Sequence, residues 1–572
     1  MRQVLIPAAG MGTRLGYITT DRPKCMIKVN GETLIARCLR QLDTLGFDRI
    51  LIVTGHSAEK LESHVKSLGI STPIYFINNP DYKVTNNIVS VAMALNDFDV
   101  FDTLLIESDL IFEKQMLEEF LEATTSRVLI APYKSYMDGT VVEIKNNKIY
   151  FSNLPENKKD VKFFKTVNIY YFTKDFLEDI FIPLLKIFLK QNLNNLYYET
   201  PLKLISDINI RSLGYHITHK KWFEIDDIND LDIASNLFSK DPLGDTQLRF
   251  GGFWRFEKMR DFTYLSNPYF PNEQFLSEMS EHLKTLVHHY PSSHAINAKL
   301  MSAILNIDQN LIMVGNGGSE LISIFADHFP CQTILAPTFK EYQNRCKYPK
   351  LAQSLNDLSK GNHDCVIIVN PNNPNGNIYQ KEALISLILK MPQTFFLIDE
   401  SFMDFAETSQ TLLNEDFLKS NKNVFILKSI GKSHGVGGLR LGALVGAEVD
   451  KFKKDLPIWN INSIAEFFMQ RFKKYEKSFH TSIASIRTER INMERRLSEI
   501  LNVTINQSHG NFAYFELEKQ HSKELQKHLF DEGFIIKIIE IDENKSGIRL
   551  AIRNQLDNHL LLAALERFKE RC

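Results

Sequence analysis

The feature that most constrains the fold is an alternation of β-rich runs with polar, amphipathic stretches. From residue 1 to about 240, RILIVTGH, TPIYFIN, DTLLIESDLIF and RVLIAPY are candidate strands, and SAEKLESHVKSL has a helical pattern. A second alternation starts near residue 253, with DCVIIVN, TFFLIDE and NVFILKS as candidate buried strands. Strands separated by helices are typical of mostly parallel α/β sheets. We therefore predict two α/β domains, the first with a Rossmann-like sheet.

The segment SKDPLGDTQLRFGGFWRF gathers Pro, Gly and Asp between the two alternations. Such residues interrupt regular structure, and 572 residues are enough for two to four domains. We predict one domain over residues 1–238, a linker over 239–252 and a second, unrelated domain over 253–572.

Composition excludes several classes of function. With 67 basic and 69 acidic side chains, the chain has no overall charge that favours nucleic acid or an anionic membrane. No apolar run reaches the ~20 residues of a membrane helix, and the first one ends at Ala9, too short for a signal peptide. We predict a cytoplasmic protein without nucleic-acid or membrane partners. The six cysteines form no C-x-x-C pair, which argues against a disulfide framework or a zinc site.

The first candidate site follows the first strand, in AAGMGTRLGYITTDRPKC. Glycines at positions 10 and 12 permit a tight turn whose backbone N–H groups would face a phosphate, and Arg14 adds a fork of donors. Pro23 stiffens the loop that carries Lys24. A glycine turn with a purely structural role is the alternative.

The G-x-G-T-R-L loop followed by P-K resembles the sugar-nucleotide and choline-phosphate nucleotidyltransferase family over about the first 235 residues. The resemblance implies catalytic roles for Arg14 and Lys24. It also implies that the loop binds the nucleotide through Ala8, Ala9, Gly10, Gly12, Thr13, Arg14 and Lys24.

Nucleotidyl transfer needs a divalent cation to neutralise the triphosphate. The resemblance implies Mg²⁺ held by Asp109, which ends LLIESD, and by Glu224 and Asp226 in WFEIDDINDL. Asp227 is a close competitor. The alternative is that these acids only cap the helices that follow them.

One further segment resembles part of the same family. NPDYKVTNNIVS looks like the base-binding loop of its cytidylyltransferase branch, in which Asn86, Asn87 and Ser90 would bind the pyrimidine of CTP. A turn formed by paired asparagines is the alternative.

The segments YMDGTVVEI and FFKTVNIYYF contribute candidate substrate-binding residues. Lys165 would be a second phosphate clamp, with Asn168 beside it. Asp138 would pair with a substrate ammonium, although a solvated strand face is an equal alternative for Asp138.

The second candidate site is built from four separate motifs. VGNGGSELI predicts a glycine turn that opens a helix, so the N–H groups of Gly317, Gly318 and Ser319 would bind a phosphate. VNPNNPNG places Asn373 at a strand end, with Asn372 as the residue most easily confused with it.

The other two motifs are FFLIDESF, which places Asp399 at the end of a buried strand, and SIGKSHGVGGLRLG, which places Arg440 eight residues after Lys432. In this order, the motifs resemble fold-type I pyridoxal-phosphate enzymes over about residues 252–572. The resemblance is greatest to histidinol-phosphate aminotransferases and threonine-phosphate decarboxylases.

This resemblance implies that Lys432 binds pyridoxal 5'-phosphate covalently and moves a proton, while Asp399 holds the pyridine nitrogen protonated. The remaining implied contacts are Asn373 to the ring hydroxyl, Phe339 to the ring face, Arg440 to the cofactor phosphate, Arg549 to a substrate α-carboxylate, and Tyr290 to the cofactor phosphate of a partner subunit. The last of these implies a homodimer.

Two positions depart from the aminotransferase pattern. Phe402 stands where a tyrosine is usual, and it cannot donate a hydrogen bond to the ring oxygen. Gly431 precedes the lysine, as in the decarboxylase branch, where the histidinol branch more often has serine. Histidinol phosphate is therefore a doubtful substrate.

A fusion suggests one compound that offers an amine to the second site and a phosphate-like oxygen to the first. 2-Aminoethylphosphonate satisfies both conditions, and the chain resembles the known fusion of phosphonate cytidylyltransferase with 2-aminoethylphosphonate transaminase. We predict transamination of phosphonoacetaldehyde with an amino-acid donor, followed by coupling to CTP.

Three alternatives remain. The second domain would decarboxylate phosphoserine, an alternative that Gly431 favours, and the first would activate phosphoethanolamine. In another, the first domain activates choline phosphate, which requires an aromatic cage near Tyr170 and Tyr171. In the third, the second domain senses a ligand without turnover.

Overall fold

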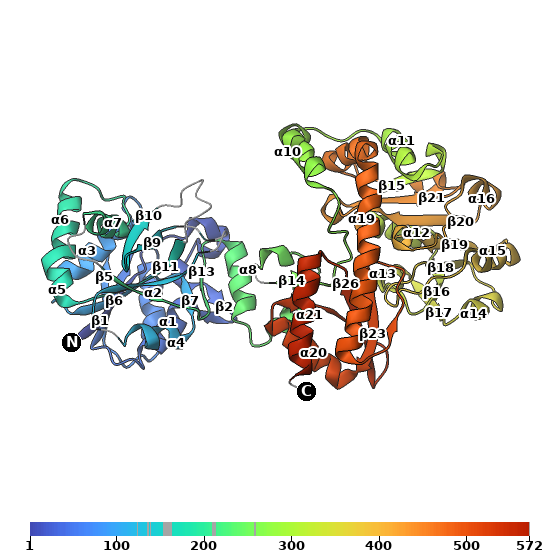
Figure 1. Ribbon diagram of the computed structural model, residues 1–572. Coiled ribbons are helices and arrows are strands. Elements are labelled where there is room, and N and C mark those ends of the chain that lie inside the picture. The colour runs from blue at the N-terminus through green and yellow to red at the C-terminus, as the bar shows by residue number, and fades with distance from the viewer. Residues whose placement is uncertain are drawn as a thin grey trace. The chain divides into compact units, whose positions relative to one another are not determined.

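The structure is a computed structural model that describes residues 1–122, 124–133, 137, 139–152, 163–208, 213–256 and 259–570. It divides into two compact units, Met1–Arg255 and Phe256–Cys572 (Figure 1). Each unit has its own α/β sheet, which confirms the predicted fold class. The segment predicted as a linker lies within the first unit, where it includes helix α9 (Pro242–Gln247).

The first unit contains a nine-stranded sheet in which seven strands follow the order β10-β9-β11-β6-β1-β4-β5, and β8 pairs with β11 and β12. The bounds are β1 (Arg2–Pro7), β4 (Arg49–Thr54), β5 (Ile74–Asn78), β6 (Asp102–Ile106), β8 (Arg127–Pro132), β9 (Val141–Lys145), β10 (Lys148–Ser152), β11 (Phe163–Phe172) and β12 (Gly214–Ile217).

This sheet is less parallel than we predicted. Strands β1, β4, β5 and β6 run parallel, but β11 is antiparallel to β6, β8 and β9. Strands β9 and β10 form a hairpin through Asn146 and Asn147, whose φ angles are 50° and 59°. Asparagine tolerates this left-handed backbone at both positions of a two-residue turn, and NN at 146–147 is the sequence signal for the antiparallel half.

Alternate residues of the parallel strands face opposite sides of the sheet, as the period of two requires. Leu5, Leu51 and Leu105 belong to one buried cluster, whereas Ile6 and Ile52 belong to another. The helices of this unit are α1 (Leu34–Leu42), α2 (Ala58–Lys66), α3 (Asn87–Asp97), α4 (Lys114–Phe120), α5 (Lys174–Phe176), α6 (Ile182–Lys190), α7 (Glu199–Asp207), α8 (Ile228–Leu237) and α9.

The predicted strand DTLLIESDLIF is broken in the middle. β6 ends at Ile106 and β7 (Leu110–Phe112) leaves the main sheet to pair with β13 (Trp222–Glu224). The break places Glu107 and Asp109 beside the end of β13. Acidic side chains from distant parts of the chain therefore meet at one edge of the sheet.

The second unit has a seven-stranded sheet in the order β15-β21-β20-β19-β18-β16-β17. The strands from β17 to β20 are parallel, and β21 is antiparallel to both of its neighbours. The bounds are β15 (Ile312–Asn316), β16 (Cys331–Leu335), β17 (Tyr348–Ala352), β18 (Cys365–Val369), β19 (Phe395–Asp399), β20 (Val424–Ser429) and β21 (Leu441–Val445).

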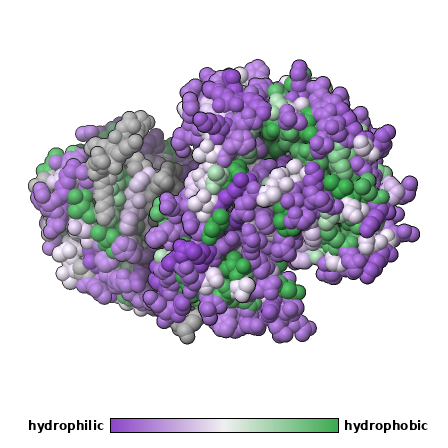
Figure 2. All heavy atoms as spheres, turned by 45° about the vertical axis from the view of Figure 1, so that its right-hand side comes forward, coloured by the Kyte–Doolittle hydropathy of each residue, from purple (hydrophilic) through white to green (hydrophobic). Residues whose placement is uncertain are grey.

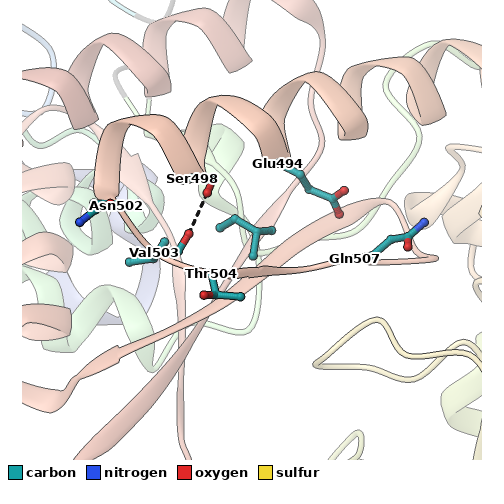
Figure 3. A pocket seen from close by; sticks show the side chains of 7 residues that line it. Glu494, Ser498, Asn502, Val503, Thr504 and Gln507 are labelled. Carbon is teal, nitrogen blue, oxygen red and sulfur yellow. Dashed lines mark hydrogen bonds between the residues drawn. The ribbon is translucent and has the colours of Figure 1, made fainter.

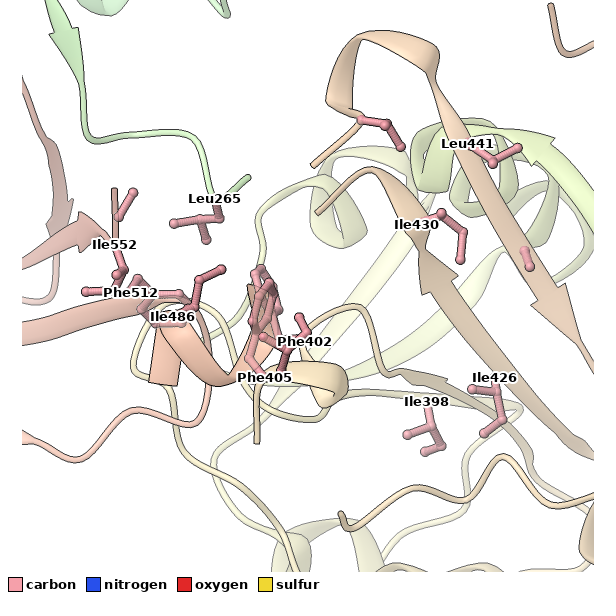
Figure 4. Close-up of a cluster of buried hydrophobic side chains, with 14 of the residues drawn as sticks. Leu265, Ile398, Phe402, Phe405, Ile426, Ile430, Leu441, Ile486, Phe512 and Ile552 are labelled. Carbon is pink, nitrogen blue, oxygen red and sulfur yellow. The ribbon is translucent and has the colours of Figure 1, made fainter. Parts of the chain in front are cut away.

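Both faces of this sheet are buried. Ile398 and Ile426 face the larger cluster, together with Phe402 and Phe405 (Figure 4), whereas Leu397 faces the smaller one. A strand that is buried on both faces reads as a continuous apolar run. This is why FFLID and VFILK were recognisable in the sequence.

The rest of the second unit packs around the 39-residue helix α19 (Ser463–Leu501), which Asn462 caps by accepting a hydrogen bond from the N–H of Ala465. Helix α19 packs against α10, α11 and α21 (Figure 1). The other main helices are α10 (Glu273–His288), α11 (His294–Leu305), α12 (Gly317–His328), α13 (Glu341–Arg345), α14 (Leu355–Ser359), α15 (Lys381–Lys390), α16 (Glu415–Ser420), α17 (Ile430–Ser433), α18 (Asp450–Lys453), α20 (Lys519–Asp531) and α21 (Gln555–Lys569).

A smaller antiparallel sheet has the order β22-β23-β26-β25. Its strands are β22 (Ile505–Asn506), β23 (Phe512–Glu518), β25 (Lys537–Glu540) and β26 (Lys545–Ala551), and a separate pair joins β14 (Arg260–Asp261) to β24 (Phe534–Ile535). Hydrophilic residues cover most of the face seen in Figure 2. Of the helices in the described part of the chain, none combines the length and low polarity of a membrane span.

Candidate active sites

The loop after β1 is held against the end of β4. The N–H of Ala8 donates to the carbonyl of Val53 at 2.8 Å, and the N–H of His56 donates to the carbonyl of Ala9 at 3.2 Å. Gly12 has a φ of 64°, and a Cβ at this position would lie 3.1 Å from the Cβ of Lys24. Glycine at this position therefore lets the loop lie close to Lys24, the second cationic side chain predicted for this site.

Lys24 lies between two of the predicted metal ligands. Its Nζ is 2.6 Å from Oδ2 of Asp109 and 2.6 Å from Oδ1 of Asp226. Arg14 Nη2 lies 2.7 Å from the same Asp226 oxygen. Burial disfavours the Lys24 ammonium, but the two carboxylates outweigh that effect and raise its pKa. Lys24 therefore stays charged, and four predicted residues are brought together.

Three carboxylates could hold a metal ion, since Glu107, Asp109 and Glu224 each offer an oxygen within 4.8 Å of the others. Burial and the charges of Asp109 and Asp226 together raise the pKa of Glu224 to about 7, although Lys165 and Lys24 act in the opposite direction. Oδ1 of Asp109 is buried and has no hydrogen-bond partner among the described residues. Clustered carboxylate oxygens suit a hard cation such as Mg²⁺, so the residues present fit the expected metal.

Glu107 was missed by the sequence reasoning, although a signal was available. In IESD it stands two residues before Asp109, close enough along the chain for both side chains to reach one site, although the strand ends at Ile106 and the chain turns before β7. Asp227, the competitor for Asp226, instead caps α8 by accepting from the N–H of Asp230 at 2.9 Å. The capping alternative therefore holds for Asp227.

Lys165 and Asn168 both contact Glu224. Nζ of Lys165 lies 3.4 Å from Oε2 of Glu224, and Nδ2 of Asn168 donates to Oε1 of Glu224 at 3.1 Å. Lys165 is almost fully buried and also donates to the carbonyl of Thr166 at 2.7 Å. These contacts position Glu224, and the role of Lys165 as a phosphate clamp stays a prediction. Asp138 lies outside the described residues.

The predicted pyrimidine-binding residues form hydrogen bonds within the protein. Asn86 caps α3, with its Oδ1 2.8 Å from the N–H of Asn87. Asn87 Nδ2 donates to Oε1 of Glu107 at 3.3 Å. Ser90 is buried and accepts from Nδ2 of Asn79 at 3.1 Å. Base binding by Asn86, Asn87 and Ser90 stays a prediction.

Tyr170 and Tyr171 do not form an aromatic cage. Both are buried, and their hydroxyls donate to Glu199 at 2.9 Å and to Asp102 at 3.3 Å. Burial raises the pKa of Tyr170, as does the nearby charge of Glu199. The choline-phosphate alternative therefore lacks the cage that it requires at these two residues.

In the second unit, Lys432 stands on the short helix α17, directly after β20. Its Nζ lies 4.5 Å from the ring centroid of Phe402 and 6.0 Å from that of Phe339. Burial lowers the pKa of Lys432; Arg549 and Arg440 lower it further, and only Asp399 opposes them. A lysine with a lowered pKa supplies the neutral amine that attacks an aldehyde.

Asp399 ends β19, as predicted, and is held by two hydrogen bonds. The hydroxyl of Tyr342 donates to Oδ2 at 2.7 Å, and the N–H of Ser401 donates to Oδ1 at 2.9 Å. Burial raises the pKa of Tyr342, and so does the charge of Asp399. These two donors fix the orientation of the carboxylate that would face a pyridine nitrogen.

Gly317 and Arg440 meet at the start of α12. Gly317 has a φ of 77°, and a Cβ there would lie 2.7 Å from Nη2 of Arg440. Gly318 and Ser319 follow in the first helical turn. An arginine against the N-terminus of a helix forms a cradle for a phosphate, so these residues fit the cofactor phosphate.

Asn373 faces the site, whereas Asn372 does not. Nη1 of Arg549 donates to Oδ1 of Asn373 at 2.5 Å, and its Nη2 donates to the carbonyl of Thr263 at 2.7 Å. Asn372 instead donates to the carbonyl of Pro337 at 2.8 Å. Burial lowers the pKa of Arg549 to about 10.

The remaining predicted residues differ in exposure. Phe402 is buried and packs edge-on against Phe512, with ring centroids 5.5 Å apart. Tyr290 is 77% exposed and stacks on Trp459 with centroids 4.3 Å apart. Its contact with a partner subunit stays a prediction.

A separate cavity of about 580 Å³ lies at the C-terminal end of α19 (Figure 3). None of the predicted site residues lines it. Its lining residues are Glu494, Ser498, Asn502, Val503, Thr504, Ile505 and Gln507.

Comparison with known proteins agrees with the two sites. Residues 291–568 match the aminotransferase class I and II family, and residues 4–160 match the MobA-like NTP transferase domain. The histidinol-phosphate aminotransferase structure from Clostridium acetobutylicum aligns with a TM-score of 0.50 and 26% identity, over 55% of this chain and 100% of that one.

Two curated relatives are also similar. The CMP-5'-(3-aminopropyl)phosphonate synthase of Streptomyces rubellomurinus is 27% identical over 98% of this chain and 94% of its own length. The L-serine phosphate decarboxylase of Campylobacter jejuni is 30% identical over 54% of this chain and 89% of its own length.

The second unit therefore belongs to the aminotransferase class I and II family, and the first unit to the MobA-like NTP transferase family. The chain is an enzyme that fuses these two families, and the aminotransferase family implies pyridoxal phosphate as a cofactor.

Proposed function

We propose that the first unit transfers the cytidylyl group of CTP to a phosphonate or phosphate oxygen of a small amine, and that the second unit makes that amine. The observation that carries the proposal is the similarity to CMP-5'-(3-aminopropyl)phosphonate synthase over 98% of the chain. That relative's name describes a CMP conjugate of an aminoalkyl phosphonate. The product of the second site would thus be the acceptor at the first.

At the first site, Asp109, Glu224 and Asp226 would hold Mg²⁺, which neutralises the triphosphate when bound. Lys24 and Arg14 would stabilise the negative charge that develops on the departing pyrophosphate. Their positions against Asp226 support this role.

At the second site, pyridoxal phosphate supplies an electron sink when bound. Lys432 would hold its aldehyde and then move a proton at the substrate carbon next to the amine. Asp399 would orient the ring, and Arg549 would bind a substrate carboxylate. The cradle of Gly317 and Arg440 would hold the phosphate.

Two routes to the amine remain. Transamination of phosphonoacetaldehyde with an amino-acid donor gives 2-aminoethylphosphonate, and its conjugate is CMP-2-aminoethylphosphonate. Decarboxylation of phosphoserine gives phosphoethanolamine, with Lys432 returning a proton to the carbon that loses CO₂. The 30% identity to a serine phosphate decarboxylase and Gly431 before the lysine favour the second route.

The two routes are tested with the full chain, pyridoxal phosphate and either precursor. Decarboxylation predicts CO₂ release from phosphoserine without an amino donor, whereas transamination predicts one keto acid for each phosphonoacetaldehyde consumed. If neither precursor yields an amine, the proposed role of the second unit is wrong.

We also propose a homodimer formed through the second unit. The support is the exposed stack of Tyr290 and Trp459, two large rings that a partner subunit would cover. Light scattering after size-exclusion chromatography should give twice the chain mass of 66.0 kDa. A single-chain mass would contradict the proposal.

A further inference from the structure

Glu107 belongs to the three-carboxylate cluster that could hold a metal ion, but the catalytic scheme above gives it no role. Asp109 pairs with Lys24, and Glu224 lies 3.4 Å from Nζ of Lys165. Within the described part of the chain, Glu107 forms no ion pair. Its carboxylate accepts from Asn87 Nδ2 at 3.3 Å and from the hydroxyl of Tyr198. Burial and the charges of Asp109, Glu199 and Glu224 raise its pKa. It is partly exposed, so a ligand in the site can reach it.

A second polar group lies beside Glu107. The side chain of Tyr198 is fully buried, and its hydroxyl donates toward the Glu107 carboxylate. The charge of Glu107 contributes to the raised pKa of that hydroxyl, after the larger effect of burial. A hydroxyl that donates to a carboxylate can still accept one hydrogen bond from a ligand.

Asn87 fixes the relative positions of these two groups. Its Nδ2 donates to Glu107, and its Oδ1 accepts from the backbone N–H of Tyr198 at 3.1 Å. One amide thus holds a carboxylate and a tyrosine on either side of it. The two hydrogen bonds of Asn87 give this arrangement a fixed geometry, which a chance cluster of acidic side chains would lack.

The chemistry of the site favours a primary ammonium group. Such a group donates three hydrogen bonds, which match the oxygens of Glu107 and the hydroxyl oxygen of Tyr198. A trimethylammonium group donates none and needs aromatic faces instead. The ring of Tyr170 offers no free face, because it is fully buried and stacks on Phe172 with centroids 5.8 Å apart.

The spacing agrees with a short substrate. An oxygen of Glu107 lies within 4.8 Å of an oxygen of Asp109, which is at the phosphate end of the site. A spacer of two or three carbons separates an amine from a phosphonate by roughly 4–5 Å, given bond lengths near those of the peptide backbone.

We propose that Glu107, supported by Tyr198, binds the primary ammonium group of the acceptor at the cytidylyl-transfer site and makes this site specific for aminoalkyl phosphonates or phosphates. The inference rests on the proposed function, because it names the part of the acceptor that the first unit recognises.

The test uses the full chain with Glu107→Gln, which removes the charge and keeps the shape. Glu118→Gln is the matched control, because Glu118 is an exposed acid of the same unit that pairs only with Lys114 among the described residues. Pyrophosphate release from CTP is measured with 2-aminoethylphosphonate against ethylphosphonate, and with phosphoethanolamine against ethyl phosphate.

We expect the wild type to prefer the amine in at least one pair by about 100-fold or more in kcat/KM, because a site built for a hydrogen-bonding group rejects an analogue without it. Glu107→Gln should reduce this preference by at least about 30-fold, mainly through the KM of the amine. The KM of CTP and the Mg²⁺ requirement should not change, and Glu118→Gln should behave like the wild type.

Three results would overturn the inference. A wild type that uses amine and amine-free acceptors equally well would remove it while leaving the proposed function standing. A Glu107→Gln variant that needs more Mg²⁺ with every acceptor would make Glu107 a metal ligand instead. A wild type that releases no pyrophosphate with any acceptor would refute the proposed function itself. If the variant does not fold, the wild-type comparison still decides.

Discussion

Lys24 and Lys432 are both largely buried lysines at the candidate sites, but their surroundings shift their pKa values in opposite directions. Burial disfavours the ammonium in both cases. Two carboxylates overcome it at Lys24 and raise the pKa, whereas Arg549 and Arg440 add to it at Lys432 and lower the pKa. Burial alone therefore does not decide the direction in which the pKa of a lysine shifts, because the neighbouring charges also contribute to it.

The contrast extends to the whole of each site. The first site is rich in carboxylates, so under the proposed function it would need a divalent cation before it could accept a triphosphate. The second site holds anions with a helix N-terminus and two arginines. The two sites would thus bind the same phosphonate or phosphate group by different means.

The largest expected effect separates the two lysines. Lys432→Ala should abolish the visible absorbance of bound pyridoxal phosphate and reduce amine formation by at least about 1000-fold, because no other amine occupies this position. Cytidylyl transfer to a supplied amine should continue at the wild-type rate, because each unit has its own core. Absorbance spectra and pyrophosphate release check both parts. Persistent absorbance would show that another lysine holds the cofactor.

The reverse experiment is Asp109→Asn, which removes a charged ligand and one of the partners of Lys24. Cytidylyl transfer should fall by about 100-fold, while the visible absorbance and amine formation stay unchanged. Parallel assays of the two activities on one preparation provide the measurement. An unaffected rate of pyrophosphate release would mean that the metal lies elsewhere.

A smaller effect should come from pH, through Glu224, whose pKa is raised to about 7 mainly by burial. Below that pH a proton occupies the carboxylate and competes with Mg²⁺, and above it the carboxylate is free. The apparent Mg²⁺ affinity of the first site should therefore increase about tenfold between pH 6 and pH 8. Titration of cytidylyl transfer with Mg²⁺ at both values checks this. An affinity that does not change with pH would remove Glu224 from the metal site.

The smallest expected effect is on stability, from removing a hydrogen bond of Asp399. The partner of Asp399 differs in kind from that of Asp109. Asp109 bonds a charged lysine, whereas Asp399 accepts from the neutral hydroxyl of Tyr342. Tyr342→Phe should lower the free energy of unfolding by about 1–2 kcal/mol, the usual cost of losing a buried hydrogen bond. Cofactor absorbance should remain. Thermal unfolding of the wild type and the variant gives the comparison, and an unchanged stability would show that the bond contributes little.

Much of both sites was predictable from the sequence because several candidate functional residues stand at the ends of strands or directly after them. Asp399 and Lys432 follow apolar runs that are buried on both faces, and such runs are easy to recognise. Lys24 follows a glycine-rich loop, and the glycines and cationic side chains of this stretch predict phosphate binding. These signals are local, and the structure brings Arg14, Lys24, Asp109 and Asp226 together in the first unit and Gly317 and Arg440 together in the second.

The partners of these residues were not predictable for a physical reason. Tyr342 reaches Asp399 across 57 positions, and Tyr198 faces Glu107 across 91 positions. No spacing rule connects such residues, because tertiary packing alone brings them together. Glu107 is different, since its position two residues before Asp109 was a readable signal. The first sheet is less parallel than predicted. Strand β11 runs antiparallel to its neighbours, and Asn146 lies in the hairpin turn between β9 and β10.

The central claim is that one compound leaves the second site and enters the first. The most direct measurement supplies the full chain with CTP, Mg²⁺, pyridoxal phosphate and either phosphoserine or phosphonoacetaldehyde with an amino donor, but no amine. Mass spectrometry should then detect a CMP-linked aminoalkyl phosphate or phosphonate, and Lys432→Ala should form it only when the amine is added. Accumulation of the free amine beside unreacted CTP would contradict the account.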